Sequence, residues 1–333
     1  MNILEISFQS EISNGYQFDI LRKSGSGCRI GNSYAGAFGY ADDLLLISPS
    51  RSGLQDMLSI AEKYAKSHKI GFSTNLDPEK SKTKGIIFSR QELKWKPAPV
   101  KLNGNILPWV KSGKYLGAKL TGVMDSFAQD SRIKRAIYIE KNCELNQEFG
   151  FAHPQVKCQI NRIYNTSFPG SILWDLNSRN VQMLENSWSV SVRHMWDLPN
   201  NSHRYFVEPL GGIHARSMLV SRYVSFMQST KRSPKFTVQL LLQMVQNDME
   251  TVTGKNVRYI LTELDQSDIF KIPKSYIKKN LLFAEVAGDD NWKVDFVKEL
   301  TGLKQNVLCL PENDHGQFTS EEIDDLVTYI TTV

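Results

Sequence analysis

Two adjacent carboxylates, Asp42 and Asp43, are the residues whose type and spacing most directly suggest chemistry. They lie between two short apolar runs, residues 36–40 and 44–47, a pattern that predicts a β-hairpin with the charges at its turn. Like charges this close repel unless a cation lies between them. Hard oxygen ligands favour Mg²⁺ or Mn²⁺, so the turn is a candidate metal site. An ordinary solvated turn is the alternative interpretation.

The elements that flank this turn are predicted from spacing. A helix is expected to end at residue 23, before the glycines of residues 24–27, and a second one to follow the turn, with apolar residues at helical spacing over 54–65. Ser52 and Gln55 form a candidate capping box for that second helix. Residues 68–75 and 85–88 read as strands. In residues 1–14 the apolar residues recur with neither helical nor strand spacing, so no element is predicted there.

The rest of the chain reads as short strands and then helices. Strands are expected over 100–110 and 113–117, with a turn at Asn103-Gly104. Helical spacing then predicts helices in the regions 133–140, 156–164, 181–192, 237–249 and 319–330. We expect the large aromatic residues to be core residues, namely Trp109, Tyr164, Trp174, Trp188 and Trp196.

Charge is distributed unevenly. Between Glu79 and Lys119 there are nine lysines and one arginine against two acidic residues, whereas no Lys or Arg follows Lys304. A basic stretch directly after a metal-binding hairpin favours a nucleic-acid path, because phosphate neutralisation supplies most sequence-independent affinity. A solvated lysine-rich surface is the alternative.

Composition limits the class of protein. No apolar run approaches the roughly 20 residues of a membrane helix, and the first residues do not resemble a secretory signal. Four cysteines without paired spacing predict reduced thiols, no disulfide framework and no zinc. We therefore expect an intracellular protein of the cytoplasm or nucleus, without a membrane partner. The widely spaced His194, His203 and His214 are expected to be surface or capping residues.

The sequence Tyr40-Ala41-Asp42-Asp43, the later Lys80-Ser81-Lys82 and the strands over 100–117 together resemble the reverse transcriptases of LINE-type, non-LTR retrotransposons. The resemblance covers roughly residues 16–260. It implies an α+β fold: residues 1–122 as a partial right-hand polymerase palm with a small antiparallel sheet, residues 123–197 as a helical thumb, and residues 198–333 as a C-terminal helical region.

The resemblance also implies a site. Asp42 and Asp43 would hold Mg²⁺ or Mn²⁺, and Lys80 would lie near the pyrophosphate leaving group. The implied partners are an RNA template, a DNA primer and deoxynucleoside triphosphates. The residues implied to contact nucleic acid are Tyr40, Lys82, Lys84, Lys114, Leu116 and Gly117, with Lys134, Arg135, Lys141, Lys157 and Arg162 as phosphate contacts of the thumb.

The chain departs from the family pattern before residue 36. The family also uses an aspartate from an earlier strand and a Gln-Gly element, and residues 1–35 contain neither. We therefore expect this chain alone to be inactive as an RNA-directed DNA polymerase, and to need an N-terminal polymerase portion. A residual, non-catalytic nucleic-acid-binding protein is the alternative function. A phospho-acceptor signalling domain is a third, disfavoured because it needs alternating parallel strands and helices.

Overall fold

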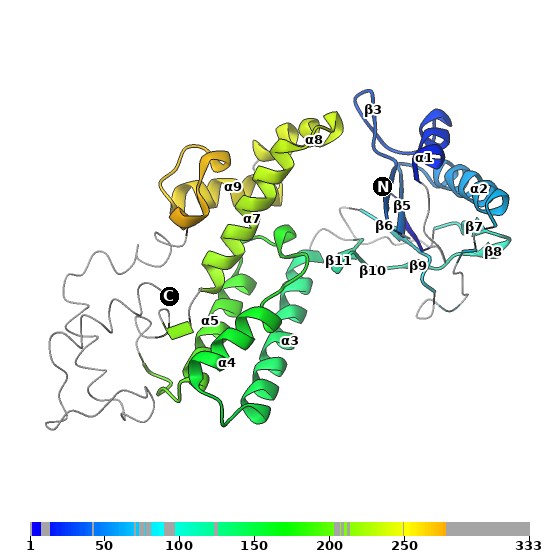
Figure 1. Ribbon diagram of the computed structural model, residues 1–333. Helices are drawn as coiled ribbons and strands as arrows, with labels where there is room; N and C mark the ends of the chain where they lie inside the picture. The colour runs from blue at the N-terminus through cyan, green and yellow to red at the C-terminus, as the bar shows by residue number, and fades with distance from the viewer. Residues whose placement is uncertain are drawn as a thin grey trace, which may run out of the picture. The chain divides into compact units, whose positions relative to one another are not determined.

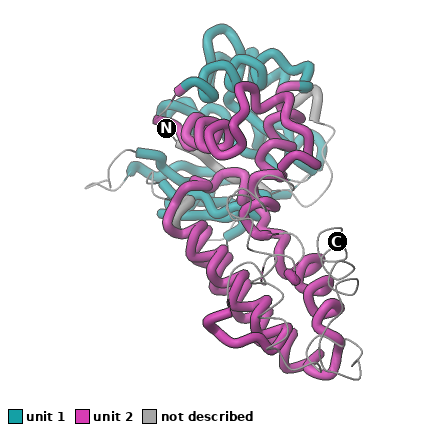
Figure 2. Tube along the Cα trace, turned by 90° about the vertical axis from the view of Figure 1, so that its left-hand side faces the viewer, with its two compact units in different colours: residues 1–130, 232–247 teal, residues 131–231, 248–333 magenta. Residues whose placement is uncertain are grey.

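The computed structural model describes the chain in two compact units, each considered by itself (Figures 1 and 2). The first comprises residues 1–130 and 232–247, and the second residues 131–231 and 248–333. The described residues are 2–7, 14–41, 43–69, 71–72, 77, 81–89, 97–122, 126–202, 207, 210–211, 214–248 and 250–277. Helices and small, mainly antiparallel sheets occur together, so the predicted α+β class is confirmed.

The main sheet of the first unit has the strand order β4-β5-β1-β6-β9. Its strands are β1 (Asn2–Ser7), β4 (Ala37–Tyr40), β5 (Asp43–Ser48), β6 (Lys84–Ile87) and β9 (Trp109–Val110). The predicted hairpin is confirmed, because β4 and β5 pair antiparallel with Tyr40 opposite Asp43. Only β6 and β9 pair in parallel within this sheet. A phospho-acceptor domain requires a parallel sheet, whereas the sheet formed by the described strands is mainly antiparallel.

The central strand, β1, was not predicted from the sequence. It pairs antiparallel with β5 on one side and with β6 on the other. Its sequence Asn-Ile-Leu-Glu-Ile-Ser has no clean alternation of apolar and polar residues. Such a short run is hard to assign as a strand because its identity depends on pairing with distant segments.

Two helices accompany this sheet, α1 (Asn14–Lys23) and α2 (Arg51–Ser67). Both were predicted, and α1 is followed by Gly25 and Gly27, which have positive φ angles. The buried face of α2 packs with apolar residues of β5 into the core of the unit. The capping residue differs from the prediction: Ser50 accepts the hydrogen bond from the Gly53 N–H.

Gln55 has a different role from the one predicted for it. Its side chain donates to the Lys101 carbonyl at 2.9 Å and accepts from the Lys101 N–H at 2.8 Å. These two bonds attach α2 to the edge of β7 (Lys101–Leu102). A long-range partner outside the helix thus replaces the local capping bond that the spacing suggested.

Three two-stranded ribbons complete the first unit: β2 (Arg29–Ile30) with β3 (Ser33–Tyr34), β7 with β8 (Asn105–Ile106), and β10 (Ser112–Tyr115) with β11 (Ala118–Thr121). Asn103 and Gly104 have φ angles of 51° and 78°, as a two-residue hairpin turn requires, so this predicted turn is confirmed. The strands predicted over 100–110 and 113–117 correspond to β7 to β10.

The end of β11 closes against β6. The Gly122 N–H donates to the Lys111 carbonyl, and the Ser89 N–H donates to the Gly122 carbonyl, both at 2.9 Å. A Cβ atom on Gly122 would lie 2.3 Å from the Ile87 carbonyl oxygen and 3.6 Å from the Ile86 side chain. Glycine is therefore required here for space, and its two backbone hydrogen bonds join the residue after β11 to residues 89 and 111.

The second unit is helical. It contains α3 (Ser126–Glu148, whose first residues belong to the first unit), α4 (Pro154–Ile160), the π-helix η1 (Asn161–Asn165), the 3₁₀ turn η2 (Ser171–Leu173), α5 (Arg179–Met195), α7 (Ala215–Arg232), α9 (Val252–Glu263) and η3 (Ile269–Lys271). The helices predicted around 133–140, 156–164 and 181–192 are confirmed. The predicted helix at 237–249 is α8 (Phe236–Gln246), which belongs to the first unit.

Asn256 of α9 anchors the second unit. Its side chain is 1% exposed, donates to the Trp174 carbonyl at 2.8 Å and accepts from the Leu176 N–H at 2.9 Å. The amide nitrogen and the amide oxygen of Asn256 thus both hold the turn that follows η2 against α9.

Several predicted features lie outside the described residues. These include the final helix at 319–330, half of the strand predicted at 68–75, and Lys80. In the described half, His68 caps the end of α2 and Lys69 follows it in a turn, so the strand does not begin at residue 68. Of the helices that the structure does describe, none combines the length and the apolar character that crossing a bilayer demands.

Gly122→Ala should destabilise the protein by about 1–3 kcal/mol, because the alanine methyl group would overlap the Ile87 carbonyl oxygen. This oxygen belongs to the backbone and cannot move aside as a flexible side chain can. Urea unfolding followed by circular dichroism measures this. Gly104→Asn is the matched control, since Gly104 has open space around it and asparagine tolerates a positive φ. Equal losses in the two variants would contradict this assignment.

Candidate nucleic-acid interface

The candidate site is built around the tip of the β4–β5 hairpin. Ala41 has a φ of 50°, which is uncommon for a residue with a side chain and belongs to the tight turn. Asp43 is the first residue of β5 and is half-buried. Asp42, its neighbour in the predicted metal pair, lies outside the described residues.

Strand register divides the hairpin into two faces. Leu44 and Leu46 belong to the core, and Ala37 packs against it, so these alternate positions face α2. The intervening positions, Phe38, Tyr40, Asp43 and Leu45, therefore occupy the opposite face, on which Leu45 is itself buried. The side chains of Phe38 and Tyr40 are 42% and 64% exposed. We call this opposite side of the sheet, with its exposed aromatic residues, the outer face.

Lys84 also lies on the outer face. It pairs with Glu5 of β1, which pairs with Leu45 of β5, and directly paired positions share a face. Strand spacing places Lys84 about 12 Å from Asp43 between Cα atoms. Lys82 is exposed just before β6. The register thus brings Tyr40, Asp43 and Lys84 to one surface.

The tip of the β10–β11 ribbon consists of Leu116 and Gly117, with φ angles of 46° and 83°. Leu116 is 50% exposed. The sequence analysis assigned Gly117 to close approach of nucleic acid. In the structure, the two-residue turn requires a positive φ at this position, and this requirement is enough to explain the glycine.

A residue that the sequence analysis missed lies beside this tip. Lys119 is directly opposite Lys114 in the antiparallel register. Like charges directly opposite each other destabilise a strand pair, so this pairing of two lysines has an electrostatic cost. The signal was present in the sequence, because a turn at Leu116-Gly117 necessarily pairs these two lysines.

The described residues do not form a metal centre by themselves. Within the part of the chain that the structure describes, no three His, Cys, Asp or Glu side chains are grouped so that they could hold an ion. At the hairpin tip, Asp43 is the described carboxylate; β1 beside it has no aspartate but carries Glu5, which its register places on the face of Asp43. Two-metal chemistry needs more oxygen ligands than one adjacent pair supplies.

The cations predicted to contact phosphate from the helical region differ in accessibility. Lys157 is buried, whereas Arg135 is half-buried and its Nε donates to the Ser187 hydroxyl at 2.8 Å. Lys141 and Arg162 are exposed.

The predictions for aromatic residues had a mixed outcome. Trp174, Trp188 and Trp196 are buried, and Trp109 packs against the core of the first unit, as predicted. Tyr164 is 68% exposed, so its assignment to the core was wrong. Tyr164 lies in η1, whose wider turn displaces side chains from the positions that α-helical spacing predicts.

The described cysteines, Cys28, Cys143 and Cys158, are free. Burial raises the pKa of the Cys158 thiol to about 11. It is therefore protonated at neutral pH and lacks the thiolate character of a nucleophile.

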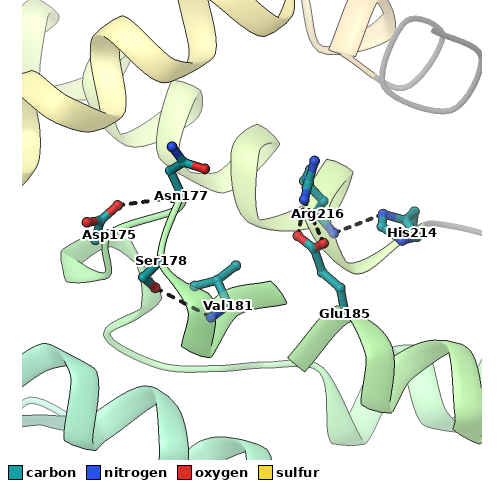
Figure 3. Close-up of polar contacts among 7 residues, drawn as sticks. All are labelled: Asp175, Asn177, Ser178, Val181, Glu185, His214 and Arg216. Carbon is teal, nitrogen blue, oxygen red and sulfur yellow. Dashed lines mark hydrogen bonds and ion pairs between the residues drawn. The ribbon is translucent and has the colours of Figure 1, made fainter. Parts of the chain in front are cut away.

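The second unit contains a partly buried ion pair between Glu185 and Arg216 (Figure 3). Arg216 holds both oxygens of Glu185, with Nε–Oε1 and Nη2–Oε2 distances of 2.8 and 2.9 Å. Burial alone would lower the pKa of Arg216, but the hydrogen bonds and charge of Glu185 outweigh it, so that pKa is raised. Because both carboxylate oxygens are engaged, we assign the pair to stability rather than to catalysis.

His214 supports the same region. Its Nδ1 accepts the Arg216 N–H at 3.2 Å, at the first turn of α7 (Figure 3). It is buried and its ring contacts Trp188 edge-on, with centroids 4.9 Å apart. The predicted capping role is thus confirmed for this histidine. His194 is exposed, and His203 lies outside the described residues.

Neither a scan against protein-family models nor a search of curated proteins found a match to this chain.

Glu185→Gln should lower the free energy of unfolding by about 1–3 kcal/mol, because it leaves the Arg216 charge partly buried without its counter-charge. The matched control is Asp19→Asn, which removes an exposed ion pair with Arg22 and should cost less than about 1 kcal/mol. Urea titration compares the two variants. A loss no larger than that of the control would contradict the stabilising role.

Proposed function

We propose that this chain is the palm and thumb part of a reverse transcriptase of the LINE type, and that it binds an RNA–DNA hybrid on the outer face of its main sheet. In this proposal residues 1–122 are the partial palm, residues 123–197 the thumb and residues 198–333 a further helical region. These 333 residues by themselves do not polymerise.

The observation that carries the proposal is the register of β4, β5, β1 and β6. It supports a hairpin that presents Tyr40 and Asp43 on the face opposite α2, with Lys84 along the same surface. An exposed aromatic ring offers a stacking surface for a base, and lysines neutralise phosphate. The β10–β11 ribbon, with Lys114 and Lys119 opposite each other, supports a further contact to a phosphate backbone.

The incomplete donor set argues against catalysis by this chain alone. Asp42 and Asp43 are adjacent in sequence, and the strand beside them supplies a glutamate, Glu5, two residues from the position opposite Asp43, but not the aspartate that the family pattern uses. When bound, Mg²⁺ or Mn²⁺ would supply charge stabilisation at the transferred phosphate. Asp43 would be one ligand and Asp42 its neighbour, with Lys80 as a cation for the leaving group. We assign no reaction step to this set.

A non-catalytic nucleic-acid-binding protein is the second candidate. The pairing of Lys114 with Lys119 favours it, because this pairing points to an anionic ligand without implying any chemistry. The two candidates agree on binding and differ in whether the hairpin takes part in nucleotide transfer when further polymerase segments are present.

Binding of an RNA–DNA hybrid should fall steeply with salt, because phosphate contacts release counter-ions. Lys114→Ala and Lys119→Ala should each reduce the slope of log affinity against log salt by about 1. Lys66→Ala is the control, since Lys66 pairs with Glu62 on α2, the helix on the opposite face. Fluorescence anisotropy measures the slopes. A salt-independent affinity, or an equal effect of the control, would contradict binding at this ribbon.

Primer extension on a primed RNA should give no product with either Mg²⁺ or Mn²⁺. The reason is that the carboxylates of this chain do not complete the ligand set of two metals. Asp42→Ala and Asp43→Ala should leave hybrid affinity reduced by no more than a few-fold. Robust extension that Asp42→Ala abolishes would show that the chain is a complete polymerase and overturn this part of the proposal.

A further inference from the structure

A buried polar cluster lies inside the second unit, between α3, η1 and α5. It consists of Tyr138, Asn142, Asn161 and Ser191, each of which is 6% exposed or less. The Asn161 Nδ2 donates to the Tyr138 hydroxyl at 3.1 Å and so joins η1 to α3. Burial raises the pKa of Tyr138 and outweighs the opposing hydrogen bonds of Asn161, Ser191 and Asn142, so the hydroxyl keeps its proton at neutral pH. All four side chains are therefore neutral.

The side-chain oxygen of Asn142 is a buried acceptor that needs a donor. Among the groups that the structure describes, none donates to Asn142 Oδ1. The orientation of this amide is fixed, because its Nδ2 donates to the Tyr138 carbonyl at 2.7 Å. Turning the amide over would place two acceptors against each other. A buried acceptor without a donor is costly, and nearly all such groups in proteins are paired with protein or with ordered water.

Asn161 Oδ1 is a second buried oxygen to which no described group donates. The nitrogen and oxygen of one amide are only about 2.2 Å apart, so this oxygen lies close to the Tyr138 hydroxyl that the Asn161 nitrogen contacts. In the reverse orientation of Asn161, the hydroxyl would donate to its oxygen instead. The need for a donor at Asn142 is the same in both cases, because Asn142 is oriented by the backbone.

We propose that this cluster is a binding site for an internal water molecule. The water donates hydrogen bonds to Asn142 Oδ1 and Asn161 Oδ1 and accepts one from the Tyr138 hydroxyl. About three hydrogen bonds are typical of a buried water. A metal cation is disfavoured, because the cluster contains no acidic side chain to balance a buried charge. This inference concerns the second unit alone and does not depend on the proposed nucleic-acid function.

The site has a structural consequence for the π-helix. Asn161 is the first residue of η1, which follows α4 directly. Its side chain is buried against α3, whereas Arg162, Ile163 and Tyr164 are exposed. π-helical turns are rare and occur mostly as single turns within α-helices. The water adds a second link between Asn161 and α3, and so stabilises the widened turn that leaves Tyr164 outside the core.

Oxygen-17 magnetic relaxation dispersion of the full chain tests the proposal, because it reports waters that stay bound for long times. Asn142→Leu and Tyr138→Phe should each reduce the dispersion amplitude by the contribution of one water, since each removes a hydrogen-bonding partner from a site of nearly unchanged volume. Gln147→Leu is the matched control, because Gln147 is an exposed residue of the same helix, and it should leave the amplitude unchanged. Circular dichroism verifies that each variant is folded. An amplitude that neither cluster variant reduces overturns the proposal.

Urea unfolding of Asn142→Leu provides a second, independent readout. If a water pairs with Asn142, leucine leaves that water and its other partners incompletely bonded, so the urea midpoint should fall below those of the original chain and of Gln147→Leu. If the Asn142 oxygen has no partner, an apolar side chain of similar size removes a buried unpaired acceptor and the midpoint stays level or rises. A level or raised midpoint would therefore contradict a bound water.

Discussion

The antiparallel pairing of β5 with β1 is the interaction on which the architecture of the first unit depends. It places β1 at the centre of the sheet and fixes which residues of the hairpin face α2. Side chains alternate along a strand, so a shift of one residue would turn Leu44 and Leu46 outward and Asp43 inward. Burial of these leucines therefore determines the orientation of the acidic tip. The position of the candidate site follows from the packing of the core.

The register of β1 and β5 bears differently on nucleic-acid binding and on metal-dependent nucleotide transfer. By register the outer face brings together an exposed tyrosine, a half-buried aspartate and Lys84, a set that the proposal assigns to a polyanion with exposed bases. Metal-dependent transfer needs a closed set of carboxylates instead. That set depends on a further aspartate beside the hairpin, and β1 offers Ser7 opposite Asp43. The proposal therefore assigns recognition of nucleic acid to this face and no reaction step to this chain alone.

Sequence reasoning recovered the features that local signals determine. The apolar runs around Asp42 and Asp43 predicted the hairpin, Asn103-Gly104 predicted a turn, and helical spacing predicted α2, α5 and α8. It failed where a distant partner decides the outcome. Strand β1 is defined by its two neighbours, and Gln55 bonds to Lys101 rather than capping its own helix. Lys119 was missed because the strand predicted over 113–117 did not place a turn at Leu116-Gly117, the turn that sets Lys119 opposite Lys114.

The central claim is that nucleic acid lies on the outer face of the sheet, and photo-cross-linking tests it most directly. An RNA–DNA hybrid carrying 5-iodouridine would be irradiated with the protein, and the linked peptides identified by mass spectrometry. The account predicts cross-links at Phe38 and Tyr40, lost from the latter in Tyr40→Leu. Cross-links concentrated on α2, with none on the β4–β5 hairpin, would contradict it.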